Sequence, residues 1–398
     1  MNCNGGVVSR KICMIVQEHY PKDVRVRKEA QSLIVRGHKV WVIALRADHE
    51  PAHEIVSGVS VHRVGLPKQR GGIPRYFIEY GVFFLAAMFK LNILDIKERF
   101  DVVHVNTLPD FLVFTAMVQK AKGKRIILDM HEIMPEFFMS KFQVGSRHAA
   151  VRCLRFLERM SLRFADHVLT VNEPIKQIFQ ERAIPDKPIA VVMNTVSAAT
   201  VTNRVKRLHR GFSCVYHGTV TDIYGLDIAI RGFAKVCCKY SDMVFHIFGD
   251  GPSLRSLKDL VDGLNLQGSV IFHGSVPYEE MMQALGAMDL GILAIRKDVF
   301  LNLSFSNKLA EYIFLKIPVV SSDLDTVKFY LGEESLMYFA AGDVNDLGSK
   351  IEFAYLNRDA MQRKAENAYK VFQRLDWDNM AEQYVSIVEN GYMRVGGS

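Results

Sequence analysis

The feature that most constrains the fold is an alternation of short β-branched runs with amphipathic segments, which stops once and then starts again. Five runs in the first half have the composition of buried parallel strands, and they occupy residues 11–16, 39–44, 102–105, 125–128 and 167–171. Amphipathic stretches separate them, for instance residues 25–36, which Gly37 closes as a helix C-cap. This alternation predicts right-handed crossovers and a doubly wound parallel sheet.

The alternation lapses after one more run at residues 189–192. Residues 194–210 are polar and carry a basic tract, so we interpret them as a linker. The pattern then restarts with runs at residues 214–216, 244–248, 270–273, 290–293 and 319–321. Since 398 residues exceed what one core usually organises, we predict two Rossmann-like α/β domains, residues 1–193 and 211–375, facing each other across a cleft. A C-terminal helix at residues 376–392 is expected to cross back onto the first domain.

Composition narrows the class of protein. Hydrophobic residues make up 49% and charged residues 23% of the chain, which argues against long disorder. The N-terminus has no signal-peptide core and the six cysteines form no C-x-x-C pair, so we expect a reducing, cytoplasmic location. Glu79 and Lys90 interrupt the most apolar stretch, residues 76–94, which leaves too few apolar residues to span a bilayer. The formal charge of +7 predicts an anionic partner.

Two glycine-rich loops follow predicted strands of the second half. Gly249 and Gly251 form a G-D-G-P turn that opens a helix, and Gly218, followed by Thr219, begins the other loop. Glycines there let the backbone approach a ligand, and amides at a helix start suit phosphate. The alternative is a pair of ordinary connectors.

A third loop joins small polar residues to an oppositely charged pair. Ser304, Phe305, Ser306 and Asn307 precede a helix that carries Lys308 and Glu311 one turn apart. The carboxylate can accept hydrogen bonds from vicinal ribose hydroxyls, and the cation can meet a diphosphate. The alternative is an exposed i,i+3 ion pair that contributes little to stability.

Taken in order, these segments resemble the retaining GT-B glycosyltransferases of family 4. The matching segments cover nearly the whole chain and are D-x-R-V-x-K-E-A at residues 23–30, D-M-H-E at 129–132, the two glycine loops, F-x-G-x-V-P at 272–277, A-x-D-x-G-I-L at 287–293 and S-F-S-N-K-L-x-E-Y at 304–312. The resemblance implies a GT-B fold of two Rossmann-like doubly wound domains facing across a cleft, with a nucleotide-sugar donor on the second domain and an acceptor on the first.

The resemblance also implies roles for individual residues. Glu311 would bind the donor ribose, the loops at Gly218 and Gly249 would approach the diphosphate, and residues 304–308 would hold phosphate and sugar. His131 would lie near the acceptor and the transferred sugar, and we place three more residues on the acceptor side: His19, Asp129 and Glu132. The alternative for His131 is a histidine that orients the turn after its strand. No metal or other cofactor is expected, because the leaving phosphate itself helps to take the acceptor proton.

The chain departs from the family pattern in three respects. Leu303 stands where an acid is usual, Thr219 and Tyr224 replace a basic pair, and residues 17–20 lack a glycine pair. Lys308 is the candidate to replace the missing positive charge. A catalytically inactive GT-B protein therefore remains an alternative.

A basic stripe points to the acceptor independently of the resemblance. Spacings of 3, 4 and 4 residues place four arginines on one helix face, and a second face carries Leu157, Met160 and Phe164; the arginines are Arg152, Arg155, Arg159 and Arg163. With the apolar stretch 76–94, this pattern suits the anionic inner face of a membrane and a polyprenyl-diphosphate-linked acceptor. The alternative is solvated charge around an ordinary core helix.

These observations predict a retaining, metal-independent glycosyltransferase. It would move a sugar from a UDP- or GDP-linked donor to a glycan or lipid-linked acceptor in cell-surface polysaccharide synthesis. The alternatives are a GT-B nucleotide-sugar epimerase and a lipid- or nucleic-acid-binding module. Nucleic acid is not the expected partner, because no aromatic platform interleaves the basic residues.

Overall fold

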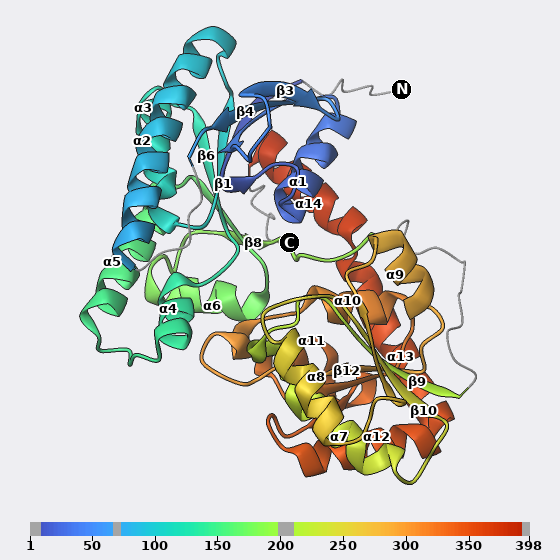
Figure 1. Ribbon diagram of the computed structural model, residues 1–398. Coiled ribbons are helices and arrows are strands. Elements are labelled where there is room, and N and C mark those ends of the chain that lie inside the picture. The colour runs from blue at the N-terminus through green and yellow to red at the C-terminus, as the bar shows by residue number, and fades with distance from the viewer. Residues whose placement is uncertain (1–8, 67–72, 198–210, 392–398) are drawn as a thin grey trace, which may run out of the picture. The chain divides into compact units, whose positions relative to one another are not determined.

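The computed structural model describes residues 9–66, 73–197 and 211–391 of the chain (Figure 1). The chain divides into two compact units. Unit 1 consists of Met1–Asn194 with Met380–Ser398, and unit 2 consists of Thr195–Asn379. Most of the basic tract that we interpret as a linker lies outside the described residues.

Unit 1 contains an eight-stranded sheet with the order β3-β4-β2-β1-β5-β6-β7-β8. All neighbouring strands are parallel except β3 and β4. The strands are β1 Lys11–His19, β2 Lys39–Leu45, β3 His53–Val56, β4 Val59–Val64, β5 Val102–Asn106, β6 Arg125–Met130, β7 His167–Thr170 and β8 Ile189–Val191.

The six runs predicted in this half are confirmed as strands, whereas the β3–β4 hairpin was not predicted. Its turn places Ser57 at φ 49° and Gly58 at φ 85°, the left-handed pair that a tight hairpin favours. Alternate residues of β3 are exposed at the edge of the sheet. The hairpin therefore lacks the continuous apolar run that marks a buried parallel strand.

Helices cover both faces of the unit 1 sheet. Figure 1 shows α2, α3 and α5 on one face and α1 and α14 on the other. The helical segments of this unit are α1 Val24–Val35, α2 Ile73–Glu98, η1 Asp110–Ala116, α3 Met117–Ala121, α4 Met134–Phe142, α5 Ala149–Phe164 and α6 Glu173–Arg182. Gly37, at φ 84°, follows the end of α1, as predicted for its C-terminus.

The last helix, α14 Trp377–Asn390, begins in unit 2 and completes the core of unit 1 from residue 380 onward. Tyr384 is fully buried, and its hydroxyl lies 2.9 Å from Nδ1 of His104 on β5. His38 Nε2 lies 3.0 Å from a carboxylate oxygen of Glu389. These contacts hold α14 against the face of the sheet that carries α1.

Unit 2 contains a six-stranded, wholly parallel sheet with the order β11-β10-β9-β12-β13-β14. The strands are β9 Phe212–His217, β10 Met243–Phe248, β11 Val270–Gly274, β12 Leu290–Leu293, β13 Val319–Ser322 and β14 Met337–Phe339. The five predicted runs are confirmed, and β14 was missed because three residues carry no periodicity. The register pairs His217 with Phe248, so the loops that leave β9 and β10 lie side by side.

The helices of unit 2 alternate with these strands, as a doubly wound sheet requires. They are η3 Asp222–Tyr224, α7 Leu226–Cys237, α8 Leu254–Gly263, α9 Tyr278–Leu285, η4 Leu301–Leu303, α10 Asn307–Phe314, α11 Asp325–Ser335, α12 Val344–Leu356, α13 Arg358–Phe372 and η5 Gln373–Leu375. Within the described parts of both units, no helix combines the length and apolar character needed to cross a membrane.

Candidate active site

The glycine loops of unit 2 pack directly against each other. The amide of Gly218 donates to the carbonyl of Phe248 (2.9 Å), and the amide of Gly249 donates to that of Gly274 (2.7 Å). A Cβ on Gly249, at φ 129°, would lie 1.9 Å from the carbonyl oxygen of Gly218, and one on Gly251 would lie 2.3 Å from that of Val220. Gly249 and Gly251 are therefore required because any side chain there would collide with the backbone of the neighbouring loop.

Lys308 on α10 reaches beneath the loop at Gly218. A Cβ on Gly218, at φ 110°, would lie 2.4 Å from Cε of Lys308, so the bare glycine makes room for this side chain. The ammonium nitrogen lies 3.7 Å from the ring centroid of Tyr224 and 5.6 Å from that of Tyr216. Burial lowers the pKa of Lys308 to about 8, although Glu311 opposes the shift. The ammonium is thus still charged at neutral pH, but it has lost most of its water.

Glu311 lies against two side chains from other elements, one of which donates a hydrogen bond to it. The hydroxyl of Tyr278, at the start of α9, donates to Oε1 over 3.1 Å, and Nε2 of His217 lies 3.2 Å from Oε2. Burial, with the nearby Lys308, lowers the pKa of His217 to about 3, so its imidazole is neutral. Lys308 and Glu311 are 9% and 8% exposed. They are buried, and the alternative of an exposed ion pair is wrong.

The loop before α10 offers a ligand its backbone amides, because its side chains are engaged within the protein or exposed. Ser304 Oγ donates to the carbonyl of Leu301 (2.7 Å), and the ring of Phe305 stacks on Phe372 at 5.3 Å. Ser306 caps α10 through its backbone, and Asn307 is exposed. The first amides of a helix have no partner within it, so this end of α10 can donate to an anion. Phe305 anchors the loop to α13.

In unit 1 a buried carboxylate organises the end of β6. Arg25 of α1 donates from Nε and Nη2 to the two oxygens of Asp129, over 2.7 and 2.9 Å, and from Nη1 to the carbonyl of Val192. Nε2 of His131 lies 2.8 Å from Oδ2 of the same carboxylate. Burial alone would raise the pKa of Asp129, but Arg25 and His131 hold it well below its usual range. Asp129 is thus ionised and positions His131.

His131 combines an oriented ring with access to solvent. Its side chain is 17% exposed, and its amide donates to Oγ1 of Thr107 (3.1 Å) at the end of the neighbouring strand. Glu132 and His19 are half-buried, the latter at the end of β1. Burial raises the pKa of Glu132 against the pull of His131 and Lys141. All these residues follow the carboxyl ends of strands, where open α/β sheets bind their ligands.

One group of potential metal ligands occurs among the described residues, and it comprises Glu29, His104 and Asp129. Nε of Arg25 lies 3.3 Å from Glu29 and 2.7 Å from Asp129, so a guanidinium already supplies the positive charge between the two carboxylates. Burial and the neighbouring Asp129 raise the pKa of Glu29 well above its usual range, despite Arg25. The group is better explained as a structural network than as a metal centre.

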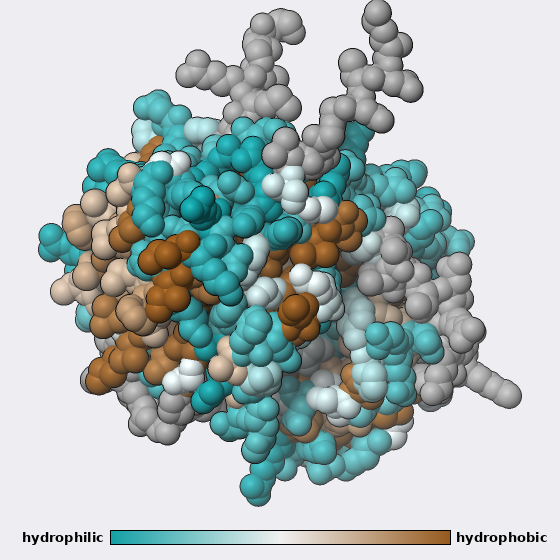
Figure 2. Space-filling model, turned by 90° about the horizontal axis from the view of Figure 1, so that it is seen from above, coloured by the Kyte–Doolittle hydropathy of each residue, from teal (hydrophilic) through white to brown (hydrophobic). Residues whose placement is uncertain are grey.

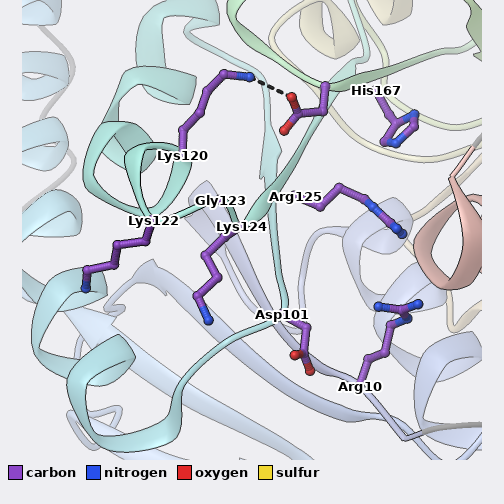
Figure 3. Close-up of a pocket in the computed structure, with 9 residues that line it drawn as sticks. Arg10, Asp101, Lys120, Lys122, Gly123, Lys124, Arg125 and His167 are labelled. Atoms are coloured by element: carbon purple, nitrogen blue, oxygen red, sulfur yellow. Dashed lines mark hydrogen bonds and ion pairs between the residues drawn. The ribbon is translucent and has the colours of Figure 1, made fainter.

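A basic pocket of unit 1 lies at the opposite, amino edge of the sheet (Figure 3). Arg10 and Arg125 extend toward each other there, and both donate to main-chain carbonyls at the end of α14. Lys120 pairs with Asp166 at 2.6 Å. Cations at the C-terminus of a helix offset the negative end of its dipole, so Arg10 and Arg125 stabilise the end of α14. None of the predicted site residues lines this pocket.

Sequence reasoning missed three residues that complete these arrangements: His217, Tyr278 and Arg25. His217 ends a predicted strand, and Tyr278 directly follows the F-x-G-x-V-P segment, so each had a positional signal. Arg25 and Glu29 have i,i+4 spacing on a predicted helix, which indicates a shared face but not the partner on β6.

The two arrangements together are typical of one class of protein. The sheet of unit 2 ends in glycine loops beside a buried carboxylate and a buried ammonium. The sheet of unit 1 ends in an oriented histidine. A nucleotide-dependent GT-B transferase requires both of these sites. The family model for Glycosyltransferase Family 4 matches residues 23–200, and that for Glycosyl transferases group 1 matches residues 211–357. The chain belongs to family 4 of the GT-B glycosyltransferases, as the sequence motifs predicted.

Individual relatives and solved structures agree with this assignment. The phosphatidylinositol N-acetylglucosaminyltransferase GPI3 subunit of Saccharomyces cerevisiae is 22% identical over 95% of this chain and 82% of its own length. The fold is similar to that of sucrose-phosphate synthase from Thermosynechococcus elongatus, with a TM-score of 0.75, 16% identity and coverage of 95% and 98%. It is also similar to HepE of Anabaena in complex with UDP, with a TM-score of 0.68, 14% identity and coverage of 95% and 99%.

Proposed function

We propose that this glycosyltransferase retains the configuration of the sugar that it transfers. Its donor would be a nucleoside diphosphate sugar bound by unit 2, and its acceptor a hydroxyl-bearing molecule bound by unit 1. The observation that carries the proposal is the buried pair Lys308 and Glu311 beneath the loop at Gly218. A buried carboxylate and a buried ammonium are retained at a cost in stability, which points to use of both in binding.

The two charges suit the two ends of a nucleoside diphosphate. Tyr278 positions Glu311, which can accept hydrogen bonds from both ribose hydroxyls. Lys308, the loop at Gly218 and the first amides of α10 can meet the diphosphate. UDP is the first nucleotide to test, because the HepE structure was solved with UDP. The name of the yeast relative makes N-acetylglucosamine the first sugar to test.

The proposed reaction replaces one bond to the anomeric carbon by another on the same face. The acceptor oxygen bonds to that carbon while the bond to the β-phosphate oxygen breaks, and the acceptor proton passes to the leaving phosphate. Lys308 and the α10 amides stabilise the charge that develops on the diphosphate. We propose that this charge makes a divalent cation unnecessary, and that Asp129 orients His131 toward the acceptor.

The exposed surface of unit 1 supports peripheral membrane association and a lipid-linked acceptor. Apolar side chains spaced three or four residues apart form one exposed stripe on α2, the α2 stripe, which consists of Ile78, Val82, Leu85, Phe89, Ile93 and Ile96. Figure 2 shows hydrophobic patches on the side of unit 1 where α2 lies. A lipid-linked acceptor at the inner face of a membrane would place the enzyme in cell-surface polysaccharide synthesis.

The predicted arginine stripe on α5 is only partly available for such a contact. Arg152, Arg159 and Arg163 are exposed. Arg155 is half-buried, with Nη2 3.9 Å from Glu136, and Nε of Arg163 donates to the carbonyl of Ala183 over 3.3 Å. Two of the four arginines therefore already have partners within unit 1, one of them because α5 packs on α4.

Incubation of the full chain with UDP-N-acetylglucosamine, with and without a lipid extract as acceptor source, tests the proposed function. Release of UDP should require acceptor, and the new linkage should keep the α configuration of the donor by NMR. His131→Ala should abolish transfer and leave the affinity for UDP unchanged. Conversion of the donor without acceptor would instead identify an epimerase, and absence of nucleotide binding would identify an inactive member of the fold.

A further inference from the structure

Unit 1 contains an apolar cavity at the carboxyl edge of its sheet. Its volume is about 190 Å³, and its walls come from α2, η1, α4 and α5. The side chains that dominate these walls are Tyr80, Phe111, Phe137, Phe138 and Leu157. Pro109 and Met134 also line it, and they follow the ends of β5 and β6. The cavity thus opens beside the same strand ends that carry Asp129 and His131.

The size of the cavity limits what can occupy it. An engineered protein cavity of about 150 Å³, lined by Leu, Ile and Phe, binds benzene. A cavity of about 190 Å³ can therefore hold a segment of about six carbon atoms. A protein partner would insert at most one side chain here, whereas a hydrocarbon chain can fill the space and continue outward.

A buried acid in the wall indicates that the occupant also carries a polar group. Asp110 lines the cavity and is 3% exposed, and its Oδ1 has no hydrogen-bond partner among the described residues. Burial, together with Glu158 and Glu132, raises the pKa of Asp110 well above its usual range. A neutral carboxyl group does not repel an anion, and its O–H can donate a hydrogen bond to a hydroxyl or phosphate oxygen.

The surroundings of the cavity favour an anionic amphiphile from a membrane. Tyr80 belongs to α2 and lies on the face of that helix opposite the exposed α2 stripe, so one helix carries both a wall of the cavity and an apolar surface. Lys141 lines the cavity, and Arg152 is exposed beside the lining residue Cys153. These cations match an anionic head group at the mouth of an apolar chain site.

We propose that this cavity holds the hydrocarbon segment nearest the head group of an anionic, lipid-linked acceptor. The phosphate of the acceptor would lie near Lys141 and its sugar hydroxyl near His131. The inference rests on the proposed function, because it concerns the acceptor of that reaction.

Calorimetry on the full chain with dodecyl phosphate and butyl phosphate, below their aggregation concentrations, tests the cavity. Each buried methylene contributes about fourfold in affinity, so dodecyl phosphate, which can fill a site of about six carbon atoms, should bind roughly fifteenfold more tightly than butyl phosphate, which fills about four. Leu157→Trp fills the cavity and should weaken dodecyl phosphate binding at least tenfold. Met160→Trp changes an exposed residue of the same helix that does not line the cavity, so it should bind like the wild type.

Ala150→Phe, at a half-buried lining position in the first turn of α5, serves as the second cavity-filling variant if Leu157→Trp does not fold. Equal affinity of dodecyl phosphate for the wild type and the folded cavity-filling variant would overturn the proposal, because the chain would then lie on the surface of α2. So would an affinity that does not depend on chain length. UDP binding measured on the same samples separates the two claims, because its loss would contradict the proposed function and leave the cavity result standing.

Discussion

The hydroxyl of Tyr278 donates a hydrogen bond to Glu311 over 3.1 Å and so joins the start of α9 to the middle of α10. This contact positions one oxygen of Glu311 before any ligand arrives, while the neutral ring of His217 lies 3.2 Å from the other oxygen. Both partners precede Glu311 in the chain by more than 30 residues. The geometry of the ribose site is therefore a property of the folded unit 2 and not of the helix alone.

Tyr278→Phe should weaken UDP binding about tenfold. The substitution removes one hydrogen bond to a charged group, worth about 1.5 kcal/mol, and leaves the ring in place. Calorimetry measures the change. Tyr355→Phe is the matched control, since its hydroxyl bonds to Asp242 on an exposed part of unit 2, and it should bind UDP like the wild type. Equal affinity of Tyr278→Phe and Tyr355→Phe would exclude a positioning role for Tyr278.

Lys308→Met should lower turnover and raise stability at the same time. Burial lowers the pKa of Lys308 from 10.5 to about 8, so burying the charged form disfavours folding by about 3 kcal/mol at pH 7. Lys308→Arg should retain more turnover than Lys308→Met, because the positive charge serves the leaving diphosphate. Lys235→Met, at an exposed position of α7, is the control for a lost lysine. Urea unfolding and initial rates test both effects, and an unchanged rate in Lys308→Met would place the cation elsewhere.

The affinity for UDP should fall as the pH rises through about 8. Only the protonated form of Lys308 attracts a diphosphate, so binding at pH 9 should be about tenfold weaker than at pH 7. The stability penalty of the buried charge has the same origin. It is fully present below pH 8 and disappears as the pH approaches the ordinary lysine value of 10.5. Lys308→Arg should bind UDP equally at both pH values, and the same decline in this variant would assign the titration to another group.

Liposome flotation should show the full chain on anionic vesicles at low salt. Three exposed arginines of α5 contribute about 1 kcal/mol each near anionic lipid, and the α2 stripe adds apolar contact. Phe89 and Ile93 are 69% and 52% exposed, so replacing both by Ser should release the protein with little effect on folding. Val35→Ser, at an exposed position of α1, is the control. A protein that stays in the dense fraction with anionic vesicles at low salt would favour an acceptor in solution.

The sequence predicted the strands of both sheets because buried parallel strands form continuous apolar runs. It did not predict the β3–β4 hairpin or β14, whose exposed or very short segments lack such runs. Lys308 and Glu311 could be predicted as functional from their place after a helix start. Their burial could not, because it depends on Tyr224, Tyr278 and His217 from other elements.

The glycine loops of unit 2 also show what the sequence alone could not predict. The sequence identified Gly249 and Gly251 as ligand-binding residues, since glycines after strands usually let a ligand approach. In the structure their missing side chains make room for the carbonyls of Gly218 and Val220. In unit 1 the order of segments predicted His131, but not the ionised Asp129 that accepts its hydrogen bond, because the partner that keeps Asp129 charged, Arg25, arrives only when α1 packs on β6.

The central claim is that Glu311 holds the ribose of a nucleoside diphosphate, and calorimetric titration of UDP into the wild type and Glu311→Ala tests it most directly. Loss of two charge-assisted hydrogen bonds should cost about 2 kcal/mol or more, which weakens binding about thirtyfold. Glu366→Ala, an exposed acid on α13, controls for loss of negative charge and should bind UDP like the wild type. A folded Glu311→Ala variant that binds UDP with unchanged affinity would contradict the account.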